Sequence, residues 1–434
     1  MSSSKTLRRN DLPAIHGGCP LISQRFRFIQ PTLPSLKNVV RKYRIAYDKG
    51  LITNADLVSK FELAVAERLQ VKHCIAVSSC TSGLMLVERA FGLTGEIIIP
   101  SFTFFATGHS ARWNGLIPVF ADCEPDTWNV DVADVERKIT KRTSALLIVH
   151  LYGNPANVEG LTEIARRHKL KLIFDAAHAF GAQHCGRPVG QFGDVEVFSL
   201  SPTKLLVAGE GGLVTTNDDA LAKVVRGMRN YGDIGAYDPE WIGMNARMSE
   251  FNAALGLAGL ATLDDRVRRR NQIATLYDEL LAPVPGLRFQ KVRPQNVSTF
   301  KDYSIHVTPK QFGLTRDELA EGLLAENIET KKYFYPPMHA QRLYKSFYSS
   351  REKGLKHTAE VTGGILSLPI YESLSESTIK TVVKAIHRLA NYAAARKQEA
   401  AVRGNVVPTA QRESTLAQPL QVNAARSQHV SRRV

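Results

Sequence analysis

The sequence has 434 residues, of which 44% are hydrophobic and 22% are charged, as in ordinary soluble globular proteins. This length is too great for one ordinary hydrophobic core and predicts two folded domains with tails. No apolar run approaches the roughly 18 residues that cross a bilayer, and residues 1–5 lack the apolar core of a signal peptide, so we expect a cytoplasmic protein without a membrane partner.

The formal net charge of +15 raises the question of a nucleic-acid partner. Residues 1–10 contribute +3 and residues 396–434 contribute +5, which leaves +7 for the body of the chain. No pattern of base-stacking aromatic residues accompanies these charges, so we interpret the ends as solvated and expect no nucleic acid. The remaining excess suits an anionic small molecule such as a nucleotide-linked sugar.

The five cysteines include no C-x-x-C pair, and their number is odd. This usage is typical of reduced thiols in a cytoplasmic protein and favours neither a disulfide framework nor a metal site.

Along the chain, short apolar runs alternate with helical patterns. After a first strand, a helix is expected over residues 82–91. The predicted strands are residues 74–77, 96–99, 118–121, 145–150, 172–174, 195–199 and 213–216. Such alternation favours an α/β fold with a mainly parallel central sheet and helices on both faces. In such sheets, ligands bind where strands end and loops turn into helices.

The second part of the chain has a different pattern. One long amphipathic stretch runs from Ser249, a plausible N-cap, to about Leu281. A strand at residues 304–308, a helix at 316–326 and a final helix at 376–395, capped by Ser375, predict a smaller α+β domain. The expected organisation is a flexible N-terminus (1–14), a large domain (15–265), a small domain (266–397) and a disordered basic tail (398–434).

A carboxylate, Asp175, directly follows the predicted strand at residues 172–174. Burying this charge is costly unless it is paired. One interpretation is a helix N-cap. The other is a partner for a pyridinium nitrogen, which keeps that nitrogen protonated and the ring an electron sink.

A lysine, Lys204, lies in an apolar stretch after the strand at residues 195–199 and is followed by Gly209-Glu-Gly-Gly212. Its apolar neighbours argue against an ordinary solvated lysine. Such surroundings can lower the pKa of an amine and favour imine formation. The glycines allow close approach of the backbone.

Small hydroxyl residues and a glycine open a helix directly after the first strand, in Ser78-Ser-Cys-Thr-Ser-Gly83. Free backbone N–H groups and the helix dipole make such a turn an anion site. A plain capping turn is the alternative.

The order of these three elements, with Lys204 29 residues after Asp175, resembles that of fold-type-I pyridoxal-phosphate (PLP) enzymes. More closely, the chain resembles the DegT/StrS-type sugar aminotransferases over residues 15–395. The segments that carry this resemblance are Leu51-Ile-Thr-Asn54, Phe61-Glu62, Pro100-Ser-Phe-Thr-Phe104, Pro118-Val-Phe-Ala-Asp122, His150-Leu-Tyr-Gly153, Asp175-Ala-Ala-His178, Gly190-Gln-Phe-Gly-Asp194, Ser199 to Lys204, Gly209-Glu-Gly-Gly212 and Asn245-Ala-Arg-Met-Ser-Glu250.

The resemblance implies specific roles. Lys204 would hold PLP as a Schiff base and move the proton, and Asp175 would pair with the pyridinium nitrogen. The other implied contacts are ring stacking by Phe104, the opposite ring face at Ala177, and phosphate binding by Thr81, Ser82 and Ser199. Asn245 would reach the phosphate of the neighbouring subunit's cofactor, which implies a homodimer with a shared active site.

Two positions depart from the family pattern. His178 stands where the family commonly has Gln; either side chain can hydrogen-bond the cofactor's 3-oxygen, but His adds a titration near neutral pH. Cys80 stands where Gly or Ala is usual, and we assign it no catalytic role. Relatives that are sugar dehydratases replace the lysine with histidine, so Lys204 argues against that reaction.

The implied reaction moves an amino group from glutamate to a nucleotide-linked 3- or 4-keto-6-deoxyhexose, in the synthesis of polysaccharides or secondary metabolites. Tyr333, Tyr335 and His339 are candidate sugar contacts, with a Pro-rich surface loop as the alternative. Arg247 and the basic run at residues 266–270 are candidate diphosphate contacts, with a solvated helix face as the alternative for the run. A keto-cyclitol acceptor, another PLP reaction and a PLP-fold regulator that binds nucleic acid remain alternatives.

Overall fold

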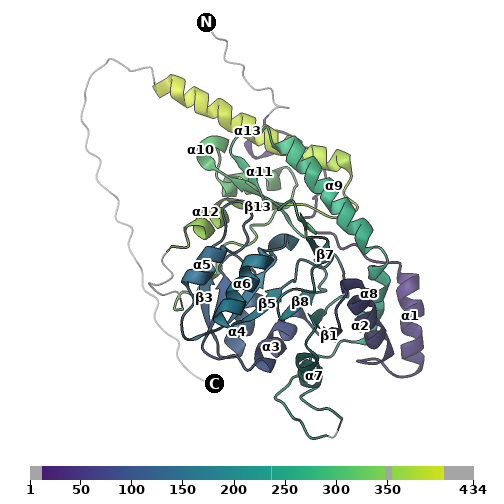
Figure 1. The fold of residues 1–434 in the computed structure, drawn as a ribbon. Helices are drawn as coiled ribbons and strands as arrows, with labels where there is room; N and C mark the ends of the chain where they lie inside the picture. Colours follow the sequence, from purple (N-terminus) through teal and green to yellow (C-terminus); the bar gives the residue numbers. More distant parts are fainter. Residues whose placement is uncertain (1–11, 236, 348–353, 405–434) are drawn as a thin grey trace, which may run out of the picture. The chain divides into compact units, whose positions relative to one another are not determined.

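The computed structural model describes residues 12–235, 237–347 and 354–404 (Figure 1). Up to Ala394 these residues belong to one compact unit, built on a seven-stranded sheet. In spatial order the strands are β1 (His73–Val77), β9 (Gly212–Thr216), β8 (Val195–Ser199), β5 (Lys171–Asp175), β4 (Thr143–Val149), β2 (Glu96–Pro100) and β3 (Ile117–Ala121).

The five strands from β8 to β3 pair in parallel, whereas β9 is antiparallel to both of its neighbours. This arrangement confirms the predicted mainly parallel sheet. All seven predicted strands of this sheet are present, with ends shifted by no more than two residues.

Both faces of the sheet are buried, and alternate residues of each strand point to opposite faces. In β2, Ile97 and Ile99 join one hydrophobic cluster, while Ile98 joins the other. The first cluster includes side chains of α3 (Cys80–Ala90), α4 (Ala106–Trp113) and α7 (Asp219–Met228). The second includes side chains of α2 (Asp56–Leu69), α6 (Val158–His168) and α8 (Glu250–Leu260). Helices therefore cover both faces, as predicted.

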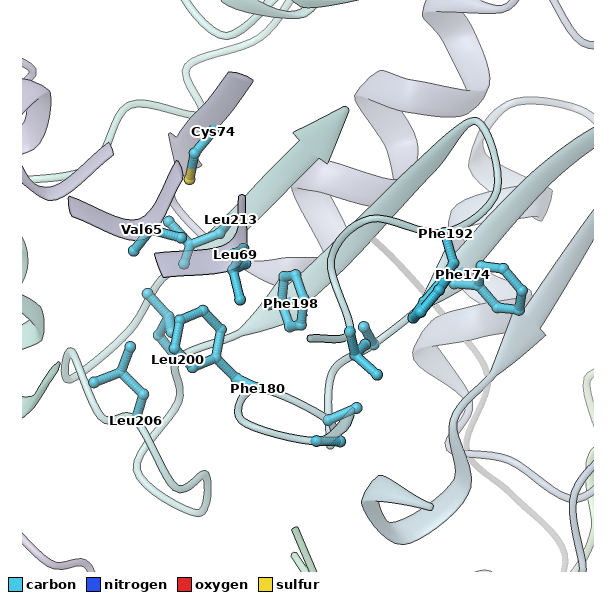
Figure 2. Packing of buried hydrophobic residues seen from close by; sticks show 14 of the residues in the cluster. Val65, Leu69, Cys74, Phe174, Phe180, Phe192, Phe198, Leu200, Leu206 and Leu213 are labelled. Carbon is cyan, nitrogen blue, oxygen red and sulfur yellow. The ribbon is translucent and has the colours of Figure 1, made fainter. Parts of the chain in front are cut away.

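Figure 2 shows part of the second cluster, where aromatic and aliphatic side chains of β8, β9 and α2 meet. Phe198 of β8 packs edge-on against Phe180, with ring centroids 5.1 Å apart and an interplanar angle of 81°. Leu69 of α2 and Leu213 of β9 lie beside them. This packing anchors the end of β8 from which the chain continues towards Lys204.

The long helix expected from residue 249 to 281 is two helices, so the prediction of one continuous amphipathic element is wrong. Ser249 caps α8, accepting a hydrogen bond from the Asn252 N–H at 3.2 Å, as predicted. Thr262 then leaves the helical region, with φ −116° and ψ 9°, and α9 runs over Leu263–Leu281. Asp264 and Asp265 in the first turn of α9 favour a new helix N-terminus there, because they complement the helix dipole.

A second core surrounds a three-stranded antiparallel sheet of β10 (Leu287–Phe289), β12 (Tyr303–Val307) and β13 (Ile365–Leu368). Side chains of α9, α11 (Arg316–Ala325) and α13 (Glu376–Gly404) complete it. The predicted strand at 304–308 and helix at 316–326 correspond to β12 and α11.

The helix α13 ends at Gly404, beyond the predicted end at residue 395. Residues 396–400 are Arg, Lys, Gln, Glu and Ala, all strong helix formers, which accounts for the extension. At its start, the Thr378 N–H donates to Ser375 Oγ at 3.1 Å, so the predicted cap is present. From Ala395 the chain belongs to a second unit. The domain boundaries remain predictions, and residues 1–11 and 405–434 of the expected flexible ends lie outside the described residues.

The remaining elements are short or lie at the edges of the two cores. They are η1 (Ala14–His16), α1 (Leu36–Asp48), α5 (Val132–Arg137), η2 (Leu151–Gly153), β6 (Gln183–His184), β7 (Arg187–Pro188), β11 (Asn296–Val297), α10 (Pro309–Phe312), η3 (Met338–Ala340) and α12 (Lys356–Gly364). Within the described ranges, no helix is both long enough and apolar enough to cross a membrane.

Candidate active site

A cavity of about 370 Å³ opens at the carboxyl ends of β4, β5 and β8, where an α/β sheet is expected to bind its ligand. Eight of the predicted site residues line it: Thr81, Phe104, Asp175, Ala177, His178, Ser199, Lys204 and Tyr333. The structure thus brings together residues from strand ends that are far apart in the sequence.

Asp175 is the last residue of β5, and the residue is only 5% exposed. The Thr107 hydroxyl donates to Oδ2 at 2.8 Å, and the Ala177 N–H donates to Oδ1 at 3.1 Å. Burial raises the pKa of this carboxyl group, and these two hydrogen bonds oppose the rise. Asp175 therefore makes a local turn contact of the capping type and also presents a carboxylate to the cavity.

Lys204 lies in the turn after β8, where its N–H donates to the Ser201 carbonyl at 3.0 Å. The buried Arg266 holds the next residue, donating to the Leu205 carbonyl at 2.9 Å. Burial, and then the nearby positive charge of Lys301, lowers the pKa of the Lys204 amine to about 8. Roughly a tenth of this amine is therefore neutral and nucleophilic at pH 7, far more than for an ordinary lysine.

The N-terminus of α3 forms one wall of the cavity through Ser79, Cys80 and Thr81. Gly212 of β9 lies directly against this turn, since a Cβ on it would meet Ser79 and Cys80 backbone atoms at 2.6 Å. Backbone N–H groups at such a helix start favour an anion. Ser82 differs from its neighbours, because its hydroxyl takes part in a capping box with Ser79, donating to the Ser79 carbonyl at 2.8 Å.

His178 is buried, and its Nδ1 accepts a hydrogen bond from the Tyr152 N–H at 3.2 Å. Its ring stacks on Phe334, with centroids 5.9 Å apart and planes 12° apart. Burial, followed by the charges of Lys204 and Lys301, lowers its pKa well below the ordinary value. The neutral ring with an accepting Nδ1 carries its proton on Nε2, so His178 is a hydrogen-bond donor from that atom.

Four of the predicted residues, besides Ser82, lie outside the lining of the cavity. Asn245 is exposed and accepts from Arg247 Nε at 3.2 Å, while the Arg247 guanidinium lies over the Tyr231 ring. Tyr335 is 52% exposed, with the Arg316 guanidinium over its ring, and His339 Nδ1 lies 2.6 Å from Ser101 Oγ.

The basic run at residues 266–270 divides into two kinds of side chain. Arg266 and Arg270 are each 5% exposed and donate to backbone carbonyl groups, and Arg270 also pairs with Glu372 at 2.8 Å. Arg268 is exposed and pairs with Asp265. The two buried arginines are therefore structural crosslinks, a role that neither the diphosphate nor the solvated-face interpretation anticipated.

Sequence reasoning missed Thr107, Glu210, Lys301 and Phe334 at the site. Lys301 had a recognisable signal, because Lys301-Asp302 places two charges directly before the buried strand β12. A charged pair at the start of a buried strand must be compensated, and it is therefore a candidate for the interior of a site.

Comparison with known proteins places this geometry in a family. The sequence matches the DegT/DnrJ/EryC1/StrS aminotransferase family over residues 37–387. It is 34% identical over 361 residues to the dTDP-4-amino-4,6-dideoxy-D-glucose transaminase of Escherichia coli, a match that covers 82% of this chain and 96% of that protein. It is also 34% identical over 391 residues to the L-glutamine:2-deoxy-scyllo-inosose aminotransferase of Micromonospora echinospora, covering 85% and 92% of the two chains.

Among solved structures, the fold is similar to that of DesI, crystallised in the presence of its TDP-sugar product. The TM-score is 0.83 at 35% identity, and the match covers 92% of this chain and 100% of DesI. These matches confirm the resemblance that the motifs indicated. The chain belongs to the DegT/DnrJ/EryC1/StrS aminotransferase family, and its enzyme class is that of the PLP-dependent aminotransferases.

Proposed function

We propose that this protein transfers an amino group from glutamate to a nucleotide-linked keto-sugar, with PLP bound in the cavity through Lys204. One observation carries the proposal: Lys204, Asp175 and the N-terminus of α3 converge on the same cavity. The names of two related proteins, a dTDP-sugar transaminase and a protein with a TDP-sugar product, support the class of acceptor.

The residues present fit the cofactor. The buried Asp175 receives hydrogen bonds from neutral donors, so its carboxylate suits a protonated ring nitrogen. The start of α3, with Thr81 and Ser199, suits the phosphate, and Phe104 and Ala177 line the space for the ring. His178 Nε2 would donate to the 3-oxygen. When bound, PLP supplies an electron sink that stabilises negative charge on the carbon that carries the amine.

Lys204 is the group that moves the proton. Its Nζ, with a pKa near 8, can both release and accept a proton near neutral pH. In the first half-reaction Nζ would take the proton from the amine-bearing carbon of glutamate. In the second it would deliver a proton to the sugar carbon that receives the amine. Asp175 is buried and Lys204 is half-buried in the same cavity, which limits the water that would compete for this proton.

We assign Tyr333 and the predicted residues outside the cavity to the acceptor and to a second subunit. Asn245 is exposed and Arg247 lies beside it, so both are available to a partner's cavity in a homodimer. Tyr333 lines the cavity itself, and Tyr335 and His339 follow on the same segment. The proposed contacts of the sugar nucleotide are Arg247, Tyr333, Tyr335 and His339, and Asn245 is the proposed contact of the partner's cofactor phosphate.

A keto-cyclitol is the second candidate acceptor, because one relative is named as a 2-deoxy-scyllo-inosose aminotransferase. Purified protein with PLP and glutamate should be tested against nucleotide-linked 3-keto- and 4-keto-6-deoxyhexoses and keto-inositols. We expect an amino sugar by mass spectrometry, together with an equal amount of 2-oxoglutarate. Amination of the cyclitol alone would favour the second candidate. Sugar turnover without 2-oxoglutarate would contradict amino transfer.

A further inference from the structure

A second lysine, Lys301, lines the cavity and forms a buried ion pair with its neighbour Asp302. The two side chains are 4% and 1% exposed, and Lys301 Nζ lies 2.9 Å and 3.0 Å from the two carboxylate oxygens of Asp302. Such a pair is costly to bury, and it is not needed to start β12, since a strand requires no charge there. The cost of burying this pair indicates that Lys301 has a function in the cavity.

The backbone of Lys301 is held from both sides. Its N–H donates to the Tyr152 carbonyl at 2.9 Å, and Arg270 Nη1 donates to its carbonyl oxygen at 2.9 Å. The same Arg270 atom also donates to the Phe300 carbonyl at 3.0 Å, while Arg270 Nε pairs with Glu372. The lysine therefore projects from a rigid segment, as a binding group requires.

None of the roles assigned so far provides a partner for the α-carboxylate of the amino donor. Its lining includes the acids Asp175 and Glu210 and the amines of Lys204 and Lys301, while His178 is neutral. An amino acid donor must bring its α-carboxylate into this space beside the carbon that reacts at Lys204. A buried carboxylate is costly unless it is paired or hydrogen-bonded, and Lys204 is engaged in the chemistry. Among the described lining residues, Lys301 is the remaining lysine or arginine.

We propose that Lys301 binds the α-carboxylate of the amino donor and that Asp302 holds the lysine in position. This inference rests on the proposed function for its donor. The ammonium can donate more hydrogen bonds than its two contacts with Asp302 use, so one N–H remains for the incoming anion.

Electrostatics support a position of Lys301 close to the reacting carbon. The charge of Lys301 is the largest influence, after burial, on the pKa of Lys204, so the two amines lie near each other. A donor carboxylate beside Lys301 would meet its ammonium group while the reacting carbon stays close to Lys204. The Tyr333 ring, whose centroid is 5.2 Å from Lys301 Nζ, closes one side of this space.

The test compares glutamate with 4-aminobutanoate, which has the same side-chain carboxylate but no α-carboxylate. The donor half-reaction is followed on the holoenzyme by the loss of its visible cofactor band, without any sugar. Lys301→Met should lower the rate constant at low glutamate concentration about 100-fold, as expected when one partner of a buried charge pair is removed. The reaction with 4-aminobutanoate should change less than about threefold, because the lost contact is absent from that donor.

Lys332→Met is the matched control. Lys332 is also a lysine paired with an aspartate, Asp317, but it is 43% exposed and lies outside the cavity lining. This variant should keep the wild-type preference for glutamate. Equal losses for both donors in Lys301→Met would overturn the proposal and indicate a structural role for the pair.

If Lys301→Met fails to bind the cofactor, Lys301→Arg and Asp302→Asn decide the question. Both keep a cation at the site, so both should retain a clear preference for glutamate over 4-aminobutanoate. Loss of that preference in both variants contradicts the proposal. These experiments use the amino donor alone. Their results can therefore be interpreted even when every keto-sugar in the panel fails as an acceptor.

Discussion

Two buried acids at the central sheet, Glu62 and Asp175, are compensated in opposite ways. Glu62 of α2 pairs with Arg226 at 2.6 Å and Arg229 at 2.5 Å and accepts the Ala76 N–H at 2.8 Å, which ties α2, α7 and β1 together. Asp175 receives hydrogen bonds from a hydroxyl and a backbone N–H, and burial raises its pKa. The first acid is a crosslink whose charge is already balanced. The second is a buried charge prepared for a cationic ligand.

The largest expected effect is on the chemistry of Asp175. Asp175→Asn keeps the size of the side chain but removes the charge that would pair with a ring nitrogen. We expect turnover to fall by about 10²- to 10³-fold, the scale seen when one preorganised electrostatic contact is lost. Steady-state kinetics and the free energy of unfolding should be measured on the same preparation.

Asp194→Asn is the control for this prediction. Asp194 directly precedes β8, at the opposite end of the sheet from the cavity, and accepts the Leu172 N–H at 2.8 Å. Its replacement should leave turnover within a factor of about two. An equal loss of turnover in both variants would show that Asp175 acts through folding.

The second-largest expected effect, at Glu62, is on stability and not on turnover. Glu62→Ala leaves Arg229 buried without its partner, so we expect the free energy of unfolding to fall by about 3–5 kcal/mol. Turnover per folded molecule should stay unchanged, because Glu62 does not line the cavity. Urea denaturation is the measurement, and Glu67→Ala, at an exposed position of the same helix, should shift stability by less than about 0.5 kcal/mol. If Glu67→Ala lowers the free energy of unfolding as much as Glu62→Ala does, the crosslink is not what stabilises this edge of the sheet.

A third buried acid, Glu88 of α3, gives a pH-dependent effect. It accepts hydrogen bonds from the Ser110 hydroxyl at 2.7 Å and the Asn114 amide at 2.9 Å, and burial raises its pKa from 4.5 to about 7. The folded state keeps this proton to a higher pH than the unfolded chain does. Glu88 should therefore lower the free energy of unfolding progressively between pH 4.5 and 7, by up to about 3 kcal/mol.

Glu88→Gln isolates this contribution, because all other titrating groups are shared with the wild type. The difference in unfolding free energy between the two proteins should change with pH only between about 4.5 and 7. A difference that is constant over this range would show that Glu88 ionises normally in the folded state.

The sequence predicts the central sheet well because its strands are buried on both faces and separate clearly from the helices. It does not reveal the break at Thr262, since apolar spacing continues from α8 into α9. At the site, Asp175 and Lys204 are recognisable because each follows its own strand. Lys301 is harder to recognise: its charged pair with Asp302 before β12 makes it a candidate for the interior of a site, but the sequence does not show that this segment folds back against Tyr152.

The same limit applies to the arginines of α9. A run of basic residues on a helix is ordinarily solvated. Arg266 and Arg270 are instead buried because carbonyl groups from other segments point at them, and this depends on tertiary structure.

The attachment of the cofactor can be located directly, since two lysines line the cavity. Borohydride reduction of the holoenzyme fixes the lysine–cofactor link, and peptide mass spectrometry then identifies the modified residue. We predict a phosphopyridoxyl group on the peptide that contains Lys204 and none on the peptide that contains Lys301. Modification of Lys301, or of no lysine in the cavity, would contradict the account.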